Sequence, residues 1–214
     1  MTDLTVKPAQ AANPEPDSLE ISSLGMWLFL ATEVMFFGAV FTAYMIYRGI
    51  YPQVFAEASS RLNLGLGSAN TAVLLTSSLA MALAVHAAQL GKRKTLIFFL
   101  LATILLGLAF LGVKGAEWAQ EFQERLYPGG QFVYTGANPD QAKLFFSLYF
   151  TLTGLHAVHM IIGIGLLAAL VVLAWRRRFS SSYYTPVEIV GLFWHFIDIV
   201  WIFIFPLLYL IHRS

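Results

Sequence analysis

The stretch Thr95–Val113, TLIFFLLATILLGLAFLGV, decides the fold class of this chain. It holds 19 residues without a charged side chain and lies between the basic turn 91–94, GKRK, and Lys114. A helix needs roughly 20 apolar residues, at about 1.5 Å of rise each, to cross the hydrocarbon of a bilayer. Because backbone groups in hydrocarbon must be satisfied internally, we predict a transmembrane helix over this stretch.

Four further apolar runs of comparable length predict four more transmembrane helices. The five predicted spans cover about 21–47, 67–90, 95–113, 142–175 and 186–211. Strands of a membrane β-barrel would instead give short alternating segments with many more turns. The sequence therefore predicts an all-α polytopic membrane protein, a bundle of five transmembrane helices within one domain, 21–214. Residues 1–20 lack the apolar core of a signal peptide and are predicted to form a mobile cytoplasmic tail.

Composition agrees with this class and excludes others. Hydrophobic residues make up 58% of the chain and charged residues 12%, against about 25% charged residues in soluble domains. The net charge of +1 offers no basic surface for nucleic acid. Cysteine is absent, which excludes disulfides, thiolate metal sites and thiol nucleophiles.

Clustered basic residues predict the orientation in the membrane. The turn 91–94 and the connection 176–182, RRRFSSS, are short, rich in Lys and Arg, and lie on the same side as the N-terminus. Short loops of this kind stay in the cytoplasm, so we expect the N-terminus inside and the C-terminus outside. The numbers alone differ little, with seven basic residues inside against six outside, so the prediction depends on the clustering of the inner ones. The six outer residues are Arg48, Arg61, Lys114, Arg125, Lys143 and Arg213.

The longest connection, 114–141, is predicted to form the largest exposed surface, on the outer side. Its first part, 117–122, can extend the third helix beyond the membrane, and the sequence Pro-Gly-Gly at 128–130 is expected to stop it.

Glu33 is the most informative polar residue inside a predicted span. It lies about 12 residues into the first span, roughly 18 Å deep by helix rise, and thus near mid-bilayer. A charge there costs at least a few kcal/mol, which indicates a functional or paired group. The alternative is a carboxyl that burial keeps neutral and that bonds a neighbouring helix.

Four histidines also lie inside the predicted spans. His156 and His159 share one face of the fourth span, and His195 and Asp198 repeat that spacing on the fifth. His86 lies near the cytoplasmic end of the second span. Imidazoles that face each other across a bundle can ligate haem. The alternative is that each histidine bonds a carbonyl, hydroxyl or carboxylate of another helix, with His195 and Asp198 as a local pair or a cross-helix clamp.

Each span also carries a distinct motif. In order they read GMWLFLATEVMFFGAVFTAY (25–44), NTAVLLTSSLAMALAVHAA (70–88), VKGAEWAQEF (113–122), TGLHAVHMIIG (153–163) and VEIVGLFWHFIDIVWIFIF (187–205). Together these motifs resemble subunit III of the haem–copper respiratory oxidases, the cytochrome c oxidase and quinol oxidase group. Any one motif is modest, but five in the same order are specific, and they cover nearly all of 25–205.

The resemblance implies an accessory subunit without a cofactor of its own. In this family subunit I holds haem and copper, reduces oxygen and pumps protons, while subunit III stabilises it, binds structural phospholipid and supports proton uptake. The implied partners are subunit I, with subunits II and IV as further candidates, and membrane lipid. The implied site residues have structural or proton-related roles, without catalytic residues or metal ligands. They are Glu33, His156, His159, Glu188, His195 and Asp198.

One departure from the family concerns length. The familiar mitochondrial form has seven spans, and this chain lacks the first pair. Either another subunit supplies the pair or it is absent. A five-span chain fits a bacterial inner membrane. Two other functions stay open: an accessory subunit of a nitric oxide reductase or another respiratory complex, and a di-haem membrane cytochrome. A transporter is disfavoured because the sequence shows no inverted repeat.

Overall fold

The computed structural model describes the chain except for residues 1–15, 130–131, 137, 182 and 211–214. Within this part the chain forms six helices: α1 (Pro16–Ile50), α2 (Pro52–Ser60), α3 (Leu64–Gln89), α4 (Arg93–Gln123), α5 (Pro139–Trp175) and α6 (Thr185–Tyr209). All but α2 are long and apolar enough to cross a membrane. The prediction of an all-α chain with five membrane-spanning helices is confirmed.

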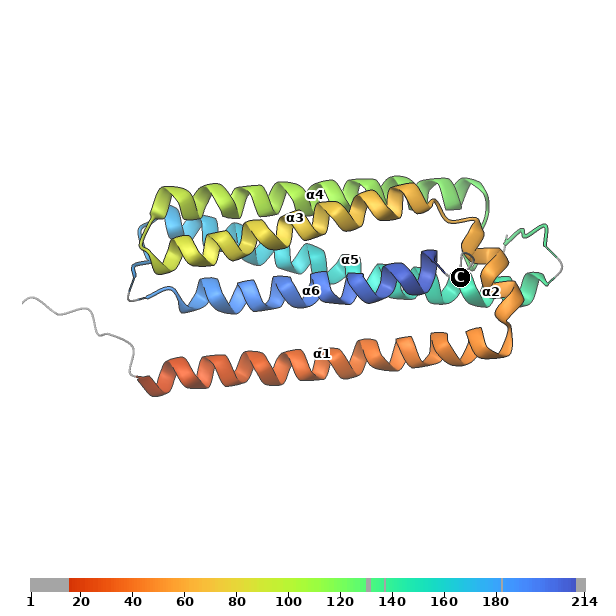
Figure 1. Cartoon of the computed structure of the whole chain (residues 1–214), viewed down its shortest axis with the longest axis horizontal. Coiled ribbons are helices and arrows are strands. Elements are labelled where there is room, and N and C mark those ends of the chain that lie inside the picture. Colours follow the sequence, from red (N-terminus) through yellow and green to blue (C-terminus); the bar gives the residue numbers. More distant parts are fainter. Residues whose placement is uncertain (1–15, 130–131, 137, 182, 211–214) are drawn as a thin grey trace, which may run out of the picture.

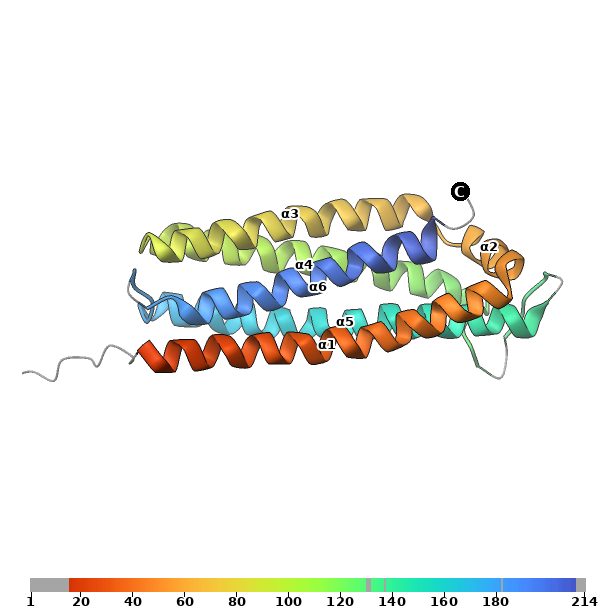
Figure 2. The same cartoon turned by 60° about the horizontal axis from the view of Figure 1, so that its bottom comes forward.

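Helices α3 to α6 form a bundle, and α1 runs along one side of it (Figures 1 and 2). In the bundle α3 packs against α4 and α6, and α5 packs against the same two helices. Only 11% of the most apolar window of α1 is buried inside the structure, against 56% for α6. Helix α1 therefore presents most of its apolar surface outward.

The two basic turns lie at one end of the bundle, together with the start of α1 (Figure 1). We call this the basic end, and it carries the turn 91–94 and the connection that follows Trp175. Helix α2 and the ends of α4 and α6 lie at the opposite, distal end. The structure thus places the two basic turns and the start of α1 on one side, as the order of the five predicted spans requires.

Helices α1, α3, α4 and α5 are longer than the predicted spans. Helix α1 begins at Pro16, inside the segment 1–20 that was predicted to be a tail, and the rest of that segment, 1–15, lies outside the described residues. Proline suits the first turn of a helix, because the backbone N–H that it lacks would be unbonded there anyway. The 35 residues of α1 extend over about 52 Å, well beyond the ~30 Å of hydrocarbon. The helix ends therefore project past the lipid core.

The predictions for the connection 114–141 are partly confirmed and partly wrong. Helix α4 continues to Gln123, so the expected helical extension over 117–122 is confirmed. It ends earlier than expected, because Arg125 adopts a left-handed φ of 58° before the chain reaches 128–130. The prediction that this region is exposed is wrong for three residues. The side chains of Lys114, Glu117 and Glu121 are only 2%, 3% and 7% exposed.

These three residues continue the buried face of α4. Its buried positions follow one another at alternating intervals of four and three residues, the spacing of a helix face that packs on its neighbours. They are Leu96, Leu100, Thr103, Gly107, Phe110, Lys114, Glu117 and Glu121. The packing face therefore crosses from apolar into charged sequence without changing direction.

Trp194 joins the four helices of the bundle. A Cβ atom at Gly107 of α4 would lie 2.9 Å from its indole ring, and one at Gly163 of α5 would lie 3.0 Å from it. The indole Nε1 donates to Ser77 Oγ of α3 at 3.0 Å. The two glycines let α4 and α5 approach a fully buried tryptophan of α6, which matches the use of small residues in membrane helix packing.

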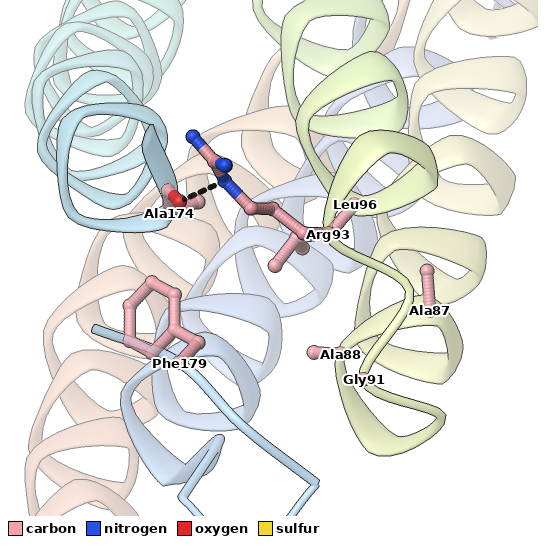
Figure 3. Close-up of a pocket in the computed structure, with 7 residues that line it drawn as sticks. All are labelled: Ala87, Ala88, Gly91, Arg93, Leu96, Ala174 and Phe179. Atoms are coloured by element: carbon pink, nitrogen blue, oxygen red, sulfur yellow. Dashed lines mark hydrogen bonds between the residues drawn. The ribbon is translucent and has the colours of Figure 1, made fainter. Parts of the chain in front are cut away.

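Side chains from other helices cap the ends of α5 and α6, where the last carbonyls lack partners within the helix. At the distal end Tyr44 Oη donates to the carbonyl of Leu207 and Ser59 Oγ to that of Leu208, each at 2.6 Å. At the basic end Arg93 Nε donates to the Ala174 carbonyl at 2.8 Å, beside a small cavity shown in Figure 3. A guanidinium there also complements the negative end of the α5 dipole.

Helix α2 lies outside the predicted spans and was not foreseen. Its Phe55 is fully buried and packs edge-on against Tyr44 of α1 and Phe145 of α5, with ring centroids 5.5 and 5.4 Å away. This aromatic contact attaches the distal end of α1 to the bundle.

Candidate functional site

Glu33 lies at the midpoint of α1 and has a partner on α5. Its Oε2 is 3.0 Å from Nε2 of His159. The side chains of Glu33 and His159 are 18% and 14% exposed. The contact fits both alternatives that the sequence left open, a paired group and a carboxyl bonded to a neighbouring helix.

The second ring nitrogen of His159 fixes how many protons the pair holds. Nδ1 lies 2.8 Å from the carbonyl oxygen of Leu155, which can only accept, so Nδ1 carries a hydrogen. Nε2 then either accepts from a protonated Glu33 carboxyl or, as part of an imidazolium, donates to a carboxylate. One proton lies between the two residues in both cases, and their net charge is zero. A neutral pair avoids most of the free-energy cost of a lone carboxylate at mid-bilayer.

His156 is one turn from His159 but has different surroundings. It is 1% exposed and packs against the rings of Phe110 and Trp201, with centroids 5.3 and 5.1 Å away. Neither of its ring nitrogens has a hydrogen-bond partner among the described residues. The shared helix face therefore does not bring His156 into the Glu33–His159 pair.

His195 forms a bond between helices. Its Nδ1 lies 2.8 Å from Ser78 Oγ on α3, which fits the predicted cross-helix clamp. Asp198, on the same helix, is 3% exposed, and its carboxyl oxygens have no hydrogen-bond partner in the described part of the chain. The structure therefore shows no local pair between His195 and Asp198.

Glu188 and His86 lie away from the middle of the bundle. Glu188 is in the first turn of α6, at the basic end, and accepts a hydrogen bond from Gln89 Nε2 at 3.1 Å. A carboxylate in a first helical turn is favoured by the helix dipole. His86 is exposed in the last turn of α3.

The densest polar cluster of the described residues was missed in the sequence. We call it the Lys114 cluster, and it consists of Lys114 and Glu117 of α4, Tyr149 of α5 and Tyr209 of α6. Lys114 Nζ donates to Glu117 Oε2 at 3.1 Å, to Tyr149 Oη at 2.8 Å and to Tyr209 Oη at 2.6 Å. The two tyrosine hydroxyls donate to Glu117 Oε1, at 3.4 and 2.5 Å. Extending the intervals of the α4 packing face beyond Val113 would have found the lysine and the glutamate.

The polar groups do not assemble into a metal site. Among the described residues no group of three or more His, Asp or Glu side chains is arranged to hold a metal ion. Both ring nitrogens of His159 are hydrogen-bonded, so they are not free to ligate haem iron. The arrangement instead offers one shared proton at mid-depth and one buried ion pair near the distal end.

Comparison with known proteins decides the family. The family model described as "Cytochrome c oxidase subunit III" matches residues 18–212. The chain belongs to this family. It is also similar to the "Probable quinol oxidase subunit 3" of Staphylococcus haemolyticus (strain JCSC1435) and to the protein with the same description in Staphylococcus aureus (strain USA300). Each is 30% identical over 192 residues, and the alignment covers 90% of each chain.

Membership of the family gives the polar groups their context. The chain is an accessory subunit III of a haem–copper oxidase, a multi-pass membrane protein that associates with other oxidase subunits. Subunits of this family are generally free of cofactors. The resemblance carried by the five motifs is confirmed.

Proposed function

We propose that this chain stabilises subunit I of a bacterial oxidase in the inner membrane, while the neighbouring subunits, with haem and copper, carry out oxygen reduction and proton pumping. The family match over residues 18–212 carries the proposal. The uncovered apolar face of α1 supports it, because that face suits contact with another membrane subunit or lipid. Subunits II and IV are further proposed partners. The bacterial relatives favour the inner (plasma) membrane of a bacterium, and their names favour quinol as the electron donor.

The proposed orientation has the basic end in the cytoplasm. Lys114 was counted among six outer basic residues, but it is buried and paired with Glu117. Without it the count becomes seven basic residues inside against five outside, which strengthens the asymmetry.

The Glu33–His159 pair is the proposed proton-related group of this subunit. It holds one proton at mid-depth and links the least buried span to α5. A pair of this kind can both stabilise helix packing and take part in proton uptake. For His156, His195, Asp198 and Glu188 we propose structural roles.

Structural phospholipid is the proposed occupant of a groove between α1 and α6. The groove has a volume of about 380 Å³, and its lining is apolar, which suits an acyl chain. It is lined by Val34, Phe37, Gly38, Phe41, Phe196, Ile199, Val200 and Phe203. A Cβ at Gly38 meets no atom within 4 Å, so a side chain introduced there starts in open space, and Gly38→Phe adds a ring at the groove. This variant should retain less phospholipid per chain in mass spectrometry than Gly25→Phe, at an equally open α1 position outside the groove.

Purification of the tagged chain in mild detergent tests the main proposal. A haem-bearing oxidase subunit should accompany it in a constant ratio, and the accompanying subunits will show whether the donor is quinol or cytochrome c. A chain that purifies alone, or that carries its own Soret band, contradicts the proposal.

A further inference from the structure

We propose that Glu121 is a proton-binding carboxyl in a hydrated chamber at the distal end of α4, and that it exchanges its proton with the aqueous phase on that side. The chamber is the cavity of about 30 Å³ whose lining includes Arg61, Asn63, Glu117, Gln120, Glu121 and Glu124.

The hydrogen bonds of the Lys114 cluster distinguish the carboxyl of Glu117, which belongs to the cluster, from the carboxyl of Glu121. Glu117 receives the lysine ammonium and both tyrosine hydroxyls, which is the environment of an ionised carboxylate. Glu121 is 7% exposed, and neither of its oxygens has a hydrogen-bond partner within 3.5 Å among the described residues. Lys114 and Tyr209 are bonded to Glu117, and only the hydroxyl of Tyr149, 3.4 Å from Glu117 Oε1, also lies near the Glu121 carboxyl.

The charges around Glu121 do not balance a second carboxylate. Lys114 supplies one positive charge, which Glu117 already matches at 3.1 Å. Glu117 of α4 and Glu124, which directly follows α4, disfavour a further negative charge, and the hydroxyls of Tyr149 and Tyr209 are neutral groups that supply no positive charge. Arg61 lines the chamber from the α2–α3 connection, yet neither Glu121 oxygen is bonded to it. A buried, unbonded carboxylate is strongly disfavoured, so Glu121 must bind a cation or a proton.

The chamber favours the proton. Its volume admits about one water molecule and is too small for a hydrated metal ion. The described residues also contain no metal-holding group. Four lining residues, Arg61, Asn63, Gln120 and Glu124, are exposed and form its outer edge. A water in the chamber can therefore pass a proton between the carboxyl and the surrounding solution.

The depth of Glu121 makes this exchange possible without crossing lipid. Glu121 lies in the last turn of α4, about 42 Å along the helix axis from Arg93, whereas the hydrocarbon is ~30 Å thick. With the basic end in the cytoplasm, the carboxyl lies in the headgroup region of the outer side.

Infrared spectroscopy of the purified oxidase complex tests the proposal. A protonated carboxyl gives a C=O stretching band that shifts in D₂O and that a carboxylate lacks. We expect Glu121 to contribute to this band near neutral pH. Its contribution should be lost in Glu121→Gln and retained in Glu124→Gln, a change at the exposed neighbour. The band should also decrease in the unmodified protein as the pH rises.

Two results would overturn the proposal. One is a band that is unchanged in Glu121→Gln, with sodium or potassium raising the melting temperature of the unmodified complex but not of the variant, which would show a bound cation. The other is that neither Glu121→Gln nor Glu121→Met accumulates while Glu124→Gln does, which would show that the position requires a charge.

Discussion

Nε2 of His159 lies 3.0 Å from Oε2 of Glu33, and this bond joins the midpoint of the least buried span to the centre of α5. Helix α1 otherwise contacts the bundle chiefly through aromatic side chains such as Phe37, whose ring centroid is 5.2 Å from that of His159. Together with the bond from Tyr44 Oη to the Leu207 carbonyl at the distal end, this directional polar contact therefore fixes the rotation of a helix whose apolar surface is mostly unpacked.

Glu33→Gln is expected to leave assembly of the oxidase largely intact. The introduced amide keeps the size of the side chain and can donate to Nε2 of His159, as a protonated carboxyl does. Glu33→Leu leaves Nε2 without a partner and should destabilise the attachment of α1 by about 1–3 kcal/mol. Co-purification with subunit I and thermal unfolding of the complex measure both effects.

Met35→Leu provides the control for both variants, because Met35 is exposed on the same helix, lies outside the lining of the apolar groove, and the change is apolar. Loss of assembly in Glu33→Gln, with Met35→Leu assembled normally, would mean that the pair requires a charge and that a neutral carboxyl is the wrong description.

His195→Ala should loosen the packing of α6 on α3 without altering the haem spectrum of the oxidase. It removes the 2.8 Å bond to Ser78 Oγ, and hydrogen bonds between membrane helices contribute about 0.6–2 kcal/mol. Thermal unfolding and the visible absorption spectrum measure the two effects. Ser78→Ala removes the same bond, so the double variant should be little worse than either single one. A change in the haem bands would contradict the cofactor-free role.

The apolar runs predicted the five spans because a helix surrounded by lipid must be apolar along its whole length, and this requirement can be read from the sequence. The depth of Glu33 could be predicted too, because it follows from the position of the residue within its run. Its partner could not be identified, because the choice between His156 and His159 depends on how α5 is rotated relative to α1. That rotation is set by packing of residues far apart in the sequence.

The Lys114 cluster was missed because charge was equated with exposure. Hydropathy falls at Lys114, yet the interval from Phe110 to Lys114 and on to Glu117 keeps the spacing of the packing face. Helical periodicity continues wherever neighbouring helices continue, and here α5 and α6 supply the tyrosines that satisfy the lysine.

Gly163→Ala should destabilise the chain, while Gly165→Ala should not. A Cβ at Gly163 lies 3.0 Å from two atoms of the Trp194 ring and 3.3 Å from Ile197, and a buried ring between helices cannot move away easily. The expected cost is about 1–3 kcal/mol. A Cβ at Gly165 meets no atom within 4 Å, so the gain in helix propensity, up to about 1 kcal/mol, should remain. Thermal unfolding in detergent compares the two variants. Equal melting temperatures would show that the Trp194 ring shifts to make room for the added methyl group.

Lys114→Met is expected to be the most damaging single change among these. It removes the charge that faces Glu117 and leaves that carboxylate buried with only the hydroxyls of Tyr149 and Tyr209, a loss of about 3–5 kcal/mol. Lys94→Met, at an exposed basic residue, is the control for the same substitution. Adding Glu117→Gln to Lys114→Met removes both charges and should recover much of the stability. The destabilisation comes from the unpaired buried charge and not from the lost hydrogen bond. Chain yield and melting temperature of the complex report the effect. If the double variant is as unstable as Lys114→Met alone, the lysine acts through the contacts of its ammonium group with the rings of Tyr149, Tyr209 and Trp201 instead of through its pairing with Glu117.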